Sequence, residues 1–260
     1  MKLLLGRKVP EVALDGLVQW LKDAASIVIL TGAGISTESG IPDFRGPQGV
    51  WTKDPESEKL SNIHYYMADP EIRQKAWRAR LEHPVWKAKP NPAHIALAEL
   101  ERKVNLERLI TQNIDGLHQM AGSSPAVLIE LHGTMWEVIC MGCGERGPMG
   151  ETLKRVEAGE EDPPCHSCGG ILKSATVSFG QSLDQSAVDA AASASAECDV
   201  FLAVGTSHTV YPAAQLPELA IRGGAKVGIF NAERTPLDAW ADFRSEQSLA
   251  ACLPEIVGKI

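Results

Sequence analysis

Four cysteines occur as two pairs with the spacing of metal ligands. Cys140 and Cys143 form one Cys-x-x-Cys pair, and Cys165 and Cys168 form the other. Two such pairs can present four thiolates tetrahedrally to zinc, and this spacing favours a metal over a redox function. Because all four ligands come from the protein, the sequence predicts a closed, structural zinc site with no position for a catalytic water.

A second group of candidate residues follows the short apolar run 26–30. The string Gly32-Ala33-Gly34-Ile35-Ser36 comes next, and glycines after a strand let the backbone approach a pyrophosphate, while a following helix offers free N–H groups to it. Thr37 occupies the third glycine position of G-x-G-x-x-G, so this string alone fits a tight strand-to-helix turn equally well. The residues that continue this string, 41–46, form a rare sequence, and they make the prediction of a phosphate-binding turn more specific.

Two further strings place polar side chains after apolar runs. The first holds Gln112, Asn113 and Asp115, whose amide and carboxylate groups can hydrogen-bond an amide and a ribose. Helix capping is the alternative, and for this string alone it is the better explanation. The second is His132-Gly133, in which an imidazole that titrates near pH 6.5, roughly its unperturbed value, can accept a proton at neutral pH. A lone histidine is more often structural or exposed.

These residues require a scaffold of strands and helices in alternation. Strands are predicted at 26–30, 109–111, 127–131, 200–204 and 226–230, and helices at 12–21, 93–100 and 186–196. Apolar runs without polar alternation are typical of parallel strands that are buried on both faces. Each run ends in small or polar residues, and ligands of open α/β sheets bind beyond the carboxyl ends of the strands. We therefore predict an α/β fold with a doubly wound parallel sheet and one composite site.

Two segments interrupt this alternation. Residues 46–92 carry three tryptophans and several prolines, and residues 138–170 carry the cysteine pairs and many glycines. We predict that 46–92, as a helical and loop insertion, and 138–170, as a zinc-binding insertion, together form a small domain. The large domain is then built from 1–45, 93–137 and 171–260.

Composition limits the classes of partner and the location. The formal charge of −8 and the pI of about 5.4 disfavour sequence-independent nucleic-acid binding, and they are compatible with a basic, lysine-bearing partner. The apolar run at 3–5 is too short for a secretory signal, and no window approaches the roughly 18 apolar residues of a membrane span. We expect a cytoplasmic protein without membrane or sequence-specific nucleic-acid partners. The sequence leaves the oligomeric state open, and a monomer is compatible with it.

Taken in order, the motifs resemble those of sirtuins. The resemblance rests on 32–46, 111–118, His132-Gly133, the two cysteine pairs, Phe179-Gly180 and Gly205-Thr206-Ser207, and it covers most of the chain. It implies a Rossmann-like domain with a zinc ribbon and an NAD-dependent protein-lysine deacylase, foremost a deacetylase. Acyl-lysine proteins would be the substrates, and the products would be free lysine, nicotinamide and O-acyl-ADP-ribose.

The resemblance also assigns roles to residues. His132 would be the general base, with Asn113 and Asp115 as further catalytic residues. Substrate would contact Val177, Phe179 and Gly180. The residues that would hold NAD are Gly32, Ala33, Gly34, Ile35, Ser36, Asp43, Phe44, Arg45, Gln112, Asn113, Ile114, Asp115, Gly205, Thr206, Ser207 and Asn231.

The chain departs from the family pattern at several positions. Ser174 and Gln181 replace a proline and a glutamate around the substrate segment, His208 replaces a leucine and is expected to be exposed, and 245–248 lacks an expected glycine. Desuccinylating sirtuins carry a Tyr-x-x-Arg pair, where this chain has Trp77-x-x-Arg80, and we expect an acetyl or other neutral acyl group. The alternative functions are mono-ADP-ribosyl transfer and a non-catalytic, NAD-sensing zinc-ribbon interaction module.

Overall fold

A six-stranded parallel sheet forms the larger part of the molecule. The computed structural model describes residues 14–260 except 45 and 47–48; Val12 and Arg45 therefore lie outside the described residues. Every neighbouring pair of strands in this sheet is parallel. Across the sheet the order is β3 (Leu128–Glu130), β2 (Leu106–Thr111), β1 (Ile27–Thr31), β7 (Val200–Val204), β8 (Lys226–Phe230) and β9 (Phe243–Ser245). The predicted doubly wound sheet is confirmed.

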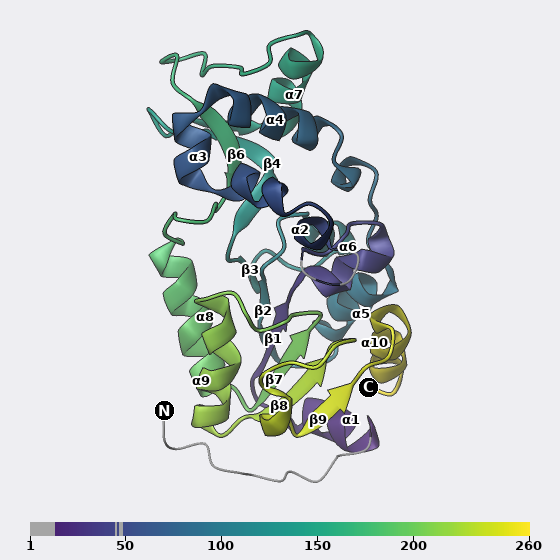
Figure 1. Ribbon diagram of the computed structural model, residues 1–260. Helices are drawn as coiled ribbons and strands as arrows, with labels where there is room; N and C mark the ends of the chain where they lie inside the picture. The colour runs from purple at the N-terminus through teal and green to yellow at the C-terminus, as the bar shows by residue number, and fades with distance from the viewer. Residues whose placement is uncertain (1–13, 45, 47–48) are drawn as a thin grey trace.

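Helices cover both faces of this sheet (Figure 1). In β1, Ile27 and Ile29 join the core on one face, while Val28 and Leu30 join the core on the other. This alternation explains why β1 is apolar at every one of these positions, since successive side chains point to opposite faces. The first core is closed by α1 (Leu14–Asp23), α5 (Pro92–Leu100) and α10 (Leu249–Gly258), and the second by α8 (Gln185–Glu197) and α9 (Leu216–Gly223).

Capping residues set where several of these helices begin. The side chain of Asn91 accepts a hydrogen bond from the N–H of Ala93, and Pro92 fills the first position of α5. Asp184 caps α8 by accepting from the N–H of Ala187. Such side chains satisfy N–H groups that have no partner within the helix, and proline at the first position loses no hydrogen bond.

A second, antiparallel sheet lies apart from the first (Figure 1). Its order is β5 (Arg146–Pro148), β4 (Gly133–Cys140) and β6 (Leu172–Thr176). With it lie α3 (Ile63–Ala68), α4 (Pro70–Leu81) and α7 (Met149–Glu157). The division into two domains stays a prediction, but this sheet includes 133–137 and 172–176, which our boundaries assigned to the large domain. Cysteine spacing located the metal loops and gave no signal for the strands that carry them.

The remaining elements are short. They are α2 (Val50–Lys53), α6 (Leu117–Ala121) and the 3₁₀ segments Ala33–Ser39, Pro55–Ser61, Pro84–Trp86, Ala213–Gln215 and Asp238–Trp240. The segment after Gly32 was expected to be a regular helix and is 3₁₀ instead. Thr37 donates its hydroxyl to the carbonyl of Gly34 at 3.0 Å, and such side-chain bonds compete with helical ones. β9 was not predicted, because a three-residue strand containing Arg244 has no apolar run.

Within the described part of the chain, no helix has both the length and the apolar character required to cross a membrane.

The strand order reverses between β1 and β7, and the loops that leave these two strands touch there. The N–H of Gly34 donates to the carbonyl of Gly205 at 2.9 Å. A Cβ on Gly34 would lie 2.8 Å from the Cα of Gly205, and one on Gly32 would lie 2.7 Å from its carbonyl oxygen. Gly205 also has a φ of +62°, which favours glycine. Only glycines allow these backbones to approach so closely.

We expect Gly34→Ala to lower the free energy of unfolding by about 1–3 kcal/mol, because its methyl group meets backbone atoms that cannot give way. Urea unfolding followed by circular dichroism measures the change. Gly150→Ala is the matched control, because a Cβ at this position in α7 meets nothing within 4 Å. Alanine there should raise stability by about 0.5–1 kcal/mol. Equal stability of Gly34→Ala and wild type would contradict the proposed close packing.

Candidate active site

A cavity of about 1080 Å³ opens at the carboxyl ends of the parallel strands. Most of the residues predicted to bind NAD or substrate line it: Gly32, Ala33, Gly34, Ser36, Asp43, Phe44, Gln112, Asn113, Ile114, Asp115, His132, Val177, Phe179, Gly180, Gly205, Thr206, Ser207 and Asn231. Ile35 does not: its side chain is 1% exposed and packs in the core against the sheet. Ile35 and the adjacent Ser36 are the buried residues of this 3₁₀ segment, which the position of Ile35 in the motif did not reveal.

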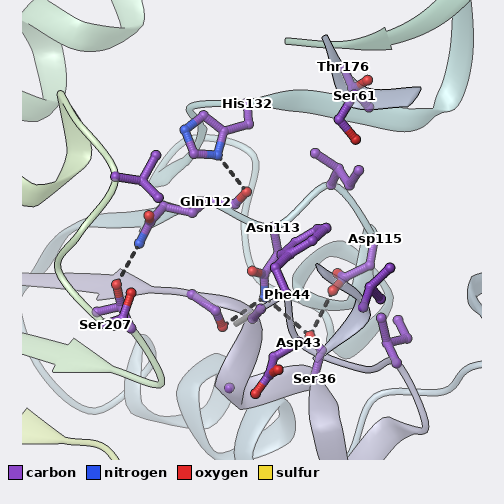
Figure 2. Close-up of a pocket in the computed structure, with 18 of the residues that line it drawn as sticks. Ser36, Asp43, Phe44, Ser61, Gln112, Asn113, Asp115, His132, Thr176 and Ser207 are labelled. Carbon is purple, nitrogen blue, oxygen red and sulfur yellow. Dashed lines mark hydrogen bonds between the residues drawn. The ribbon is translucent and has the colours of Figure 1, made fainter. Parts of the chain in front are cut away.

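The floor of the cavity is a network of short hydrogen bonds (Figure 2). The amide nitrogen of Asn113 donates to the carbonyl of Gly32 at 3.1 Å and to the hydroxyl of Ser36 at 3.2 Å. Ser36 in turn donates to Asp115 at 2.7 Å. Burial raises the pKa of Asp115, while hydrogen bonds from Leu117 and Ser36 oppose this. The network joins the loops after β1 and β2, so that Asn113 and Asp115 are held in fixed orientations.

Two buried histidines lie behind this network. His118 contacts the hydroxyl of Thr31 at 2.9 Å, and its ring lies edge-on to that of His94, with the centroids 5.0 Å apart. Burial lowers the pKa of His94 to about 4 and that of His118 to about 3, the latter with a smaller effect of His94. Both rings are therefore neutral at pH 7 and serve as packing and hydrogen-bonding groups.

His132 lies on the cavity wall between the two sheets (Figure 2). Its Nδ1 is 2.9 Å from the carbonyl oxygen of Gln112. A carbonyl can only accept, so Nδ1 carries the proton and Nε2 keeps its lone pair. Burial lowers the pKa of His132, and the hydrogen bond to Gln112 partly opposes it. The imidazole is thus neutral at pH 7 and able to accept a proton through Nε2.

The substrate segment predicted from the sequence crosses the same cavity. The N–H of Val177 donates to the carbonyl of His132 at 2.8 Å, which fixes the segment beside the imidazole. The N–H of Phe179 donates to Ser61 at 2.8 Å, and its carbonyl accepts from Ile63 at 3.0 Å. Phe179 is 37% exposed at the cavity and therefore offers its ring as an apolar surface.

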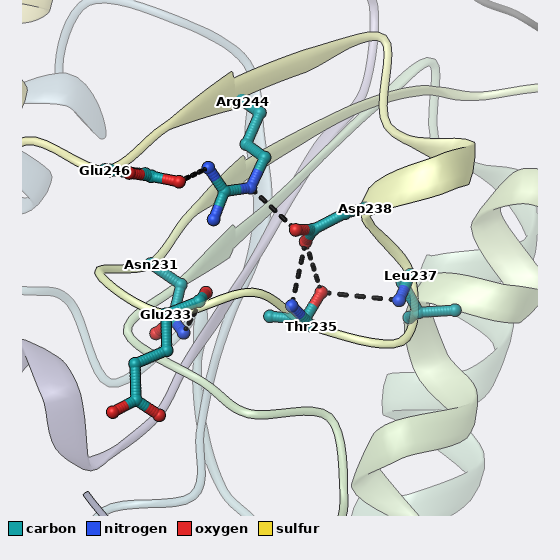
Figure 3. Close-up of polar contacts among 7 residues, drawn as sticks. All are labelled: Asn231, Glu233, Thr235, Leu237, Asp238, Arg244 and Glu246. Carbon is teal, nitrogen blue, oxygen red and sulfur yellow. Dashed lines mark hydrogen bonds and ion pairs between the residues drawn. The ribbon is translucent and has the colours of Figure 1, made fainter. Parts of the chain in front are cut away.

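Two carboxylates and an amide line the far end of the cavity, and Figure 3 shows the polar contacts that they make with their neighbours. Asn231, Glu233 and Glu246 line it, as do the residues 247–249. Arg244 bonds to Asp238 at 2.7 Å and also pairs with Glu246. The second pair fixes the carboxylate of Glu246, the residue that follows β9. Sequence reasoning missed Glu233 and Glu246; recognition of β9 would have pointed to the latter, since it follows the strand end. His208, expected to be exposed, is 6% exposed, because its backbone turns with a φ of 56° and buries the ring.

Four sulfur atoms meet in the small unit. The Sγ atoms of the predicted ligands Cys140, Cys143, Cys165 and Cys168 all lie within 4.8 Å of one another. The N–H of Gly142 donates to the sulfur of Cys140 at 3.3 Å, and that of Gly170 to the sulfur of Cys168 at 3.4 Å. Donors aimed at sulfur stabilise thiolates, which are the form that binds zinc. This all-cysteine set fits a structural zinc ion, and His166 is not part of it.

These features define an α/β protein with a composite cavity at the switch point of a parallel sheet and a four-cysteine metal centre. The model of the Sir2 family matches residues 32–212. The chain is 52% identical to NAD-dependent protein deacetylase 2 of Streptomyces coelicolor over 89% of its length and 96% of that protein. It is 42% identical to NAD-dependent protein deacetylase 1 of Pyrobaculum aerophilum over 95% of its length and 94% of that protein.

Solved structures agree with this relationship. A Sir2 structure with a p53 peptide and NAD⁺ superposes with a TM-score of 0.85 at 35% identity, covering 95% of this chain and 98% of that one. A Sir2 variant with a deacetylated p53 peptide and 3′-O-acetyl-ADP-ribose gives 0.88 at 36% identity, with coverage of 95% and 98%. The chain belongs to the Sir2 family.

We expect purified protein to contain about one zinc ion per chain, as the single four-thiolate site requires. Cys140→Ala should lose this zinc and become less soluble and less stable, because binding of a structural zinc is coupled to folding. Cys252→Ala is the control, since Cys252 is buried in α10 away from the cluster. Metal analysis and thermal unfolding measure both effects. A stable, active preparation without metal would contradict this assignment.

Proposed function

We infer that this chain is an NAD-dependent protein-lysine deacylase that releases free lysine, nicotinamide and O-acyl-ADP-ribose. The observation that carries the inference is the position of His132, neutral and with Nε2 unprotonated, on the wall of the cavity that Asn113 and Asp115 also line. The inference is further supported by the relatives described above, which are named as NAD-dependent protein deacetylases.

We propose that NAD lies across the strand ends. The glycines at the switch point give room for its phosphates, and Thr206 and Ser207 supply hydroxyls beside them. Asn231, at the end of β8, is assigned to the adenosine ribose, with Glu233 close by. Asn113 and Asp115 are assigned to the nicotinamide side, where Ser36 holds them. Asp43 and Phe44 are assigned to the border of the nicotinamide ribose.

The acyl-lysine side chain is placed against Val177 and Phe179. NAD supplies a ribose carbon whose nicotinamide is a good leaving group, and the acyl oxygen attacks that carbon. His132 would then remove a proton from a ribose hydroxyl through Nε2, while Nδ1 stays bonded to Gln112. The deprotonated ribose oxygen would attack the acyl carbon, and addition of one water would break the bond from that carbon to nitrogen, which releases lysine and leaves the acyl group on ADP-ribose. The chain thus contributes positioning, a neutral base and a cavity floor of fixed polar groups.

We also propose the partners, the location and the role of zinc that accompany this activity. We propose acyl-lysine segments of proteins as the partners, a cytoplasmic location, and no membrane or sequence-specific nucleic-acid partner. The net charge of −8 supports a preference for basic, lysine-bearing segments. Zinc is assigned a structural role, because the four cysteines would complete its coordination without a water.

His132→Ala should abolish deacylation and leave NAD binding largely intact, because the variant loses the base and keeps the groups assigned to NAD. Mass spectrometry of NAD with an acetyl-lysine peptide detects acetyl-ADP-ribose, and calorimetric titration measures NAD binding. Near-normal turnover by the variant would remove His132 from the mechanism. Transfer of ADP-ribose from NAD to protein without deacylation would favour the transferase alternative instead.

The pH dependence of kcat/KM should follow the ionisation of His132. Because burial lowers its pKa below the usual 6.5, the imidazole is in its basic form from below pH 6.5 upward. Activity on an acetyl-lysine peptide should therefore rise with pH along a limb whose midpoint lies below pH 6.5, and then level off. An ascending limb with an apparent pKa above 7 would contradict this assignment.

A further inference from the structure

The loop that carries Asn113 and Asp115 is held from two sides. On the side of the cavity floor, these two side chains bond to Gly32 and Ser36 (Figure 2). On the other side lies the segment 132–136, which begins with His132 and continues into β4. Three backbone carbonyls of the loop accept hydrogen bonds from this segment, so the loop is fixed along its length.

The three donors of this segment are an imidazole, a backbone N–H and an indole. In chain order, at 2.9, 2.9 and 2.8 Å, the bonds run from Nδ1 of His132 to Gln112, from the N–H of Met135 to Ile114, and from Nε1 of Trp136 to Asp115. The imidazole belongs to the proposed base, and the backbone N–H is part of β4 itself. The indole bond is therefore the one that a substitution can remove without changing either.

The indole of Trp136 fits closely against the end of the loop. Gly116 has a φ of +73°, and a Cβ at this position would lie 2.5 Å from Nε1 of Trp136. Glycine is thus required here for the left-handed backbone and for the space that the indole occupies. Because Gly116 directly precedes α6, the indole sits where the loop passes into this helix.

A second tryptophan supports this indole. The ring of Trp86 lies edge-on to that of Trp136, at 87° and with the centroids 5.3 Å apart, which is a favourable aromatic arrangement. Nε1 of Trp86 donates to the carbonyl of Arg80, which ties Trp86 to the last turn of α4. Trp136 itself is 37% exposed and is not among the residues that line the cavity. Since an exposed ring gains less from burial, the hydrogen bond and the ring contact account for its position.

We propose that Trp136 is a positioning residue for the nicotinamide side of the cavity: its indole N–H holds the carbonyl of Asp115, and thereby sets where the side chains of Asn113 and Asp115 lie. This inference rests on the proposed deacylase function, which assigns these two side chains to nicotinamide. Trp136 acts through the backbone of the loop and touches neither NAD nor substrate. Without the indole N–H, the loop loses its last attachment to β4, and both the binding of nicotinamide and its release from NAD should weaken.

The first experiment separates the hydrogen bond from the bulk of the ring. The five-membered ring of histidine matches that of tryptophan, with Nε2 in the place of Nε1, so Trp136→His keeps a donor and loses the six-membered ring. Trp136→Phe keeps a six-membered ring and loses the donor. At about pH 8, where an exposed imidazole is neutral, kcat/KM for NAD should fall about 3- to 10-fold in Trp136→Phe, as loss of one hydrogen bond provides. Trp136→His should lie closer to wild type.

Two results of this experiment would overturn the inference. One is an equal kcat/KM for NAD in Trp136→Phe and wild type. The other is a value for Trp136→His at or below that for Trp136→Phe, which would assign the effect to packing alone. Circular dichroism checks that each variant is folded, and Trp136→Leu replaces Trp136→Phe as the variant without a donor if the latter does not fold.

The second experiment asks which constant changes. In Trp136→Phe the KM for NAD and the inhibition constant of nicotinamide should both rise, while the KM for an acetyl-lysine peptide at saturating NAD stays at the wild-type value. The substrate segment is attached to His132 and Ser61 and not to Trp136, which is the reason for this difference. Trp20→Phe is the matched control, since Trp20 lies in α1 and packs against the first core; it should change none of these constants.

The outcomes distinguish this inference from the function on which it rests. An unchanged inhibition constant of nicotinamide in Trp136→Phe, or an equal rise in the KM for the peptide, would overturn the inference and leave the deacylase function standing. A wild-type protein that releases no nicotinamide from NAD in the presence of the peptide would overturn both.

Discussion

The structure depends on the contact between two glycine-containing loops where the parallel sheet reverses its order. Gly34 and Gly205 lie so close that a single methyl group on either would meet backbone atoms. Because neither glycine carries a side chain, the backbone at the ends of β1 and β7 leaves room for a ligand at the switch point. It also sets the position of Ser36, and through Ser36 that of Asn113 and Asp115. The site is therefore built outward from a backbone contact.

The polar side chains on the cavity floor are stabilised by hydrogen bonds to one another and to the backbone. The buried carboxyl of Asp115 accepts from Ser36 and from the N–H of Leu117, and Asn113 bonds to a backbone carbonyl and a hydroxyl. Buried polar groups are costly when they are unpaired, and a satisfied network holds one arrangement. The neutral His94 and His118 extend this network into the core. The pocket floor is consequently organised before any ligand binds.

The general base lies where the chain passes from one sheet to the other. β3 ends at Glu130 and β4 begins at Gly133, so His132 belongs to the connection. Gly133 has a φ of +71°, and a Cβ there would lie 2.1 Å from the carbonyl oxygen of Ala175. The same turn directs the carbonyl of His132 to Val177. One tight turn thus places the base beside both the proposed NAD site and the substrate segment, and β6 carries the cavity onward to Arg80.

The sequence predicted those features that depend on residues close to one another along the chain. Apolar runs predicted the parallel strands, strand-end residues predicted the composite site, and cysteine spacing predicted the four-sulfur cluster. The burial of a side chain and its partners depend on segments that are distant in sequence. Only the tertiary structure therefore showed that Ile35 and His208 are buried, and that Glu233 and Glu246 line the cavity. Arg80 illustrates the difference best. The sequence places three arginines on one helix, and only the packing of α4 decided that Arg73 and Arg78 pair with carboxylates while Arg80 donates to the hydroxyl of Ser174.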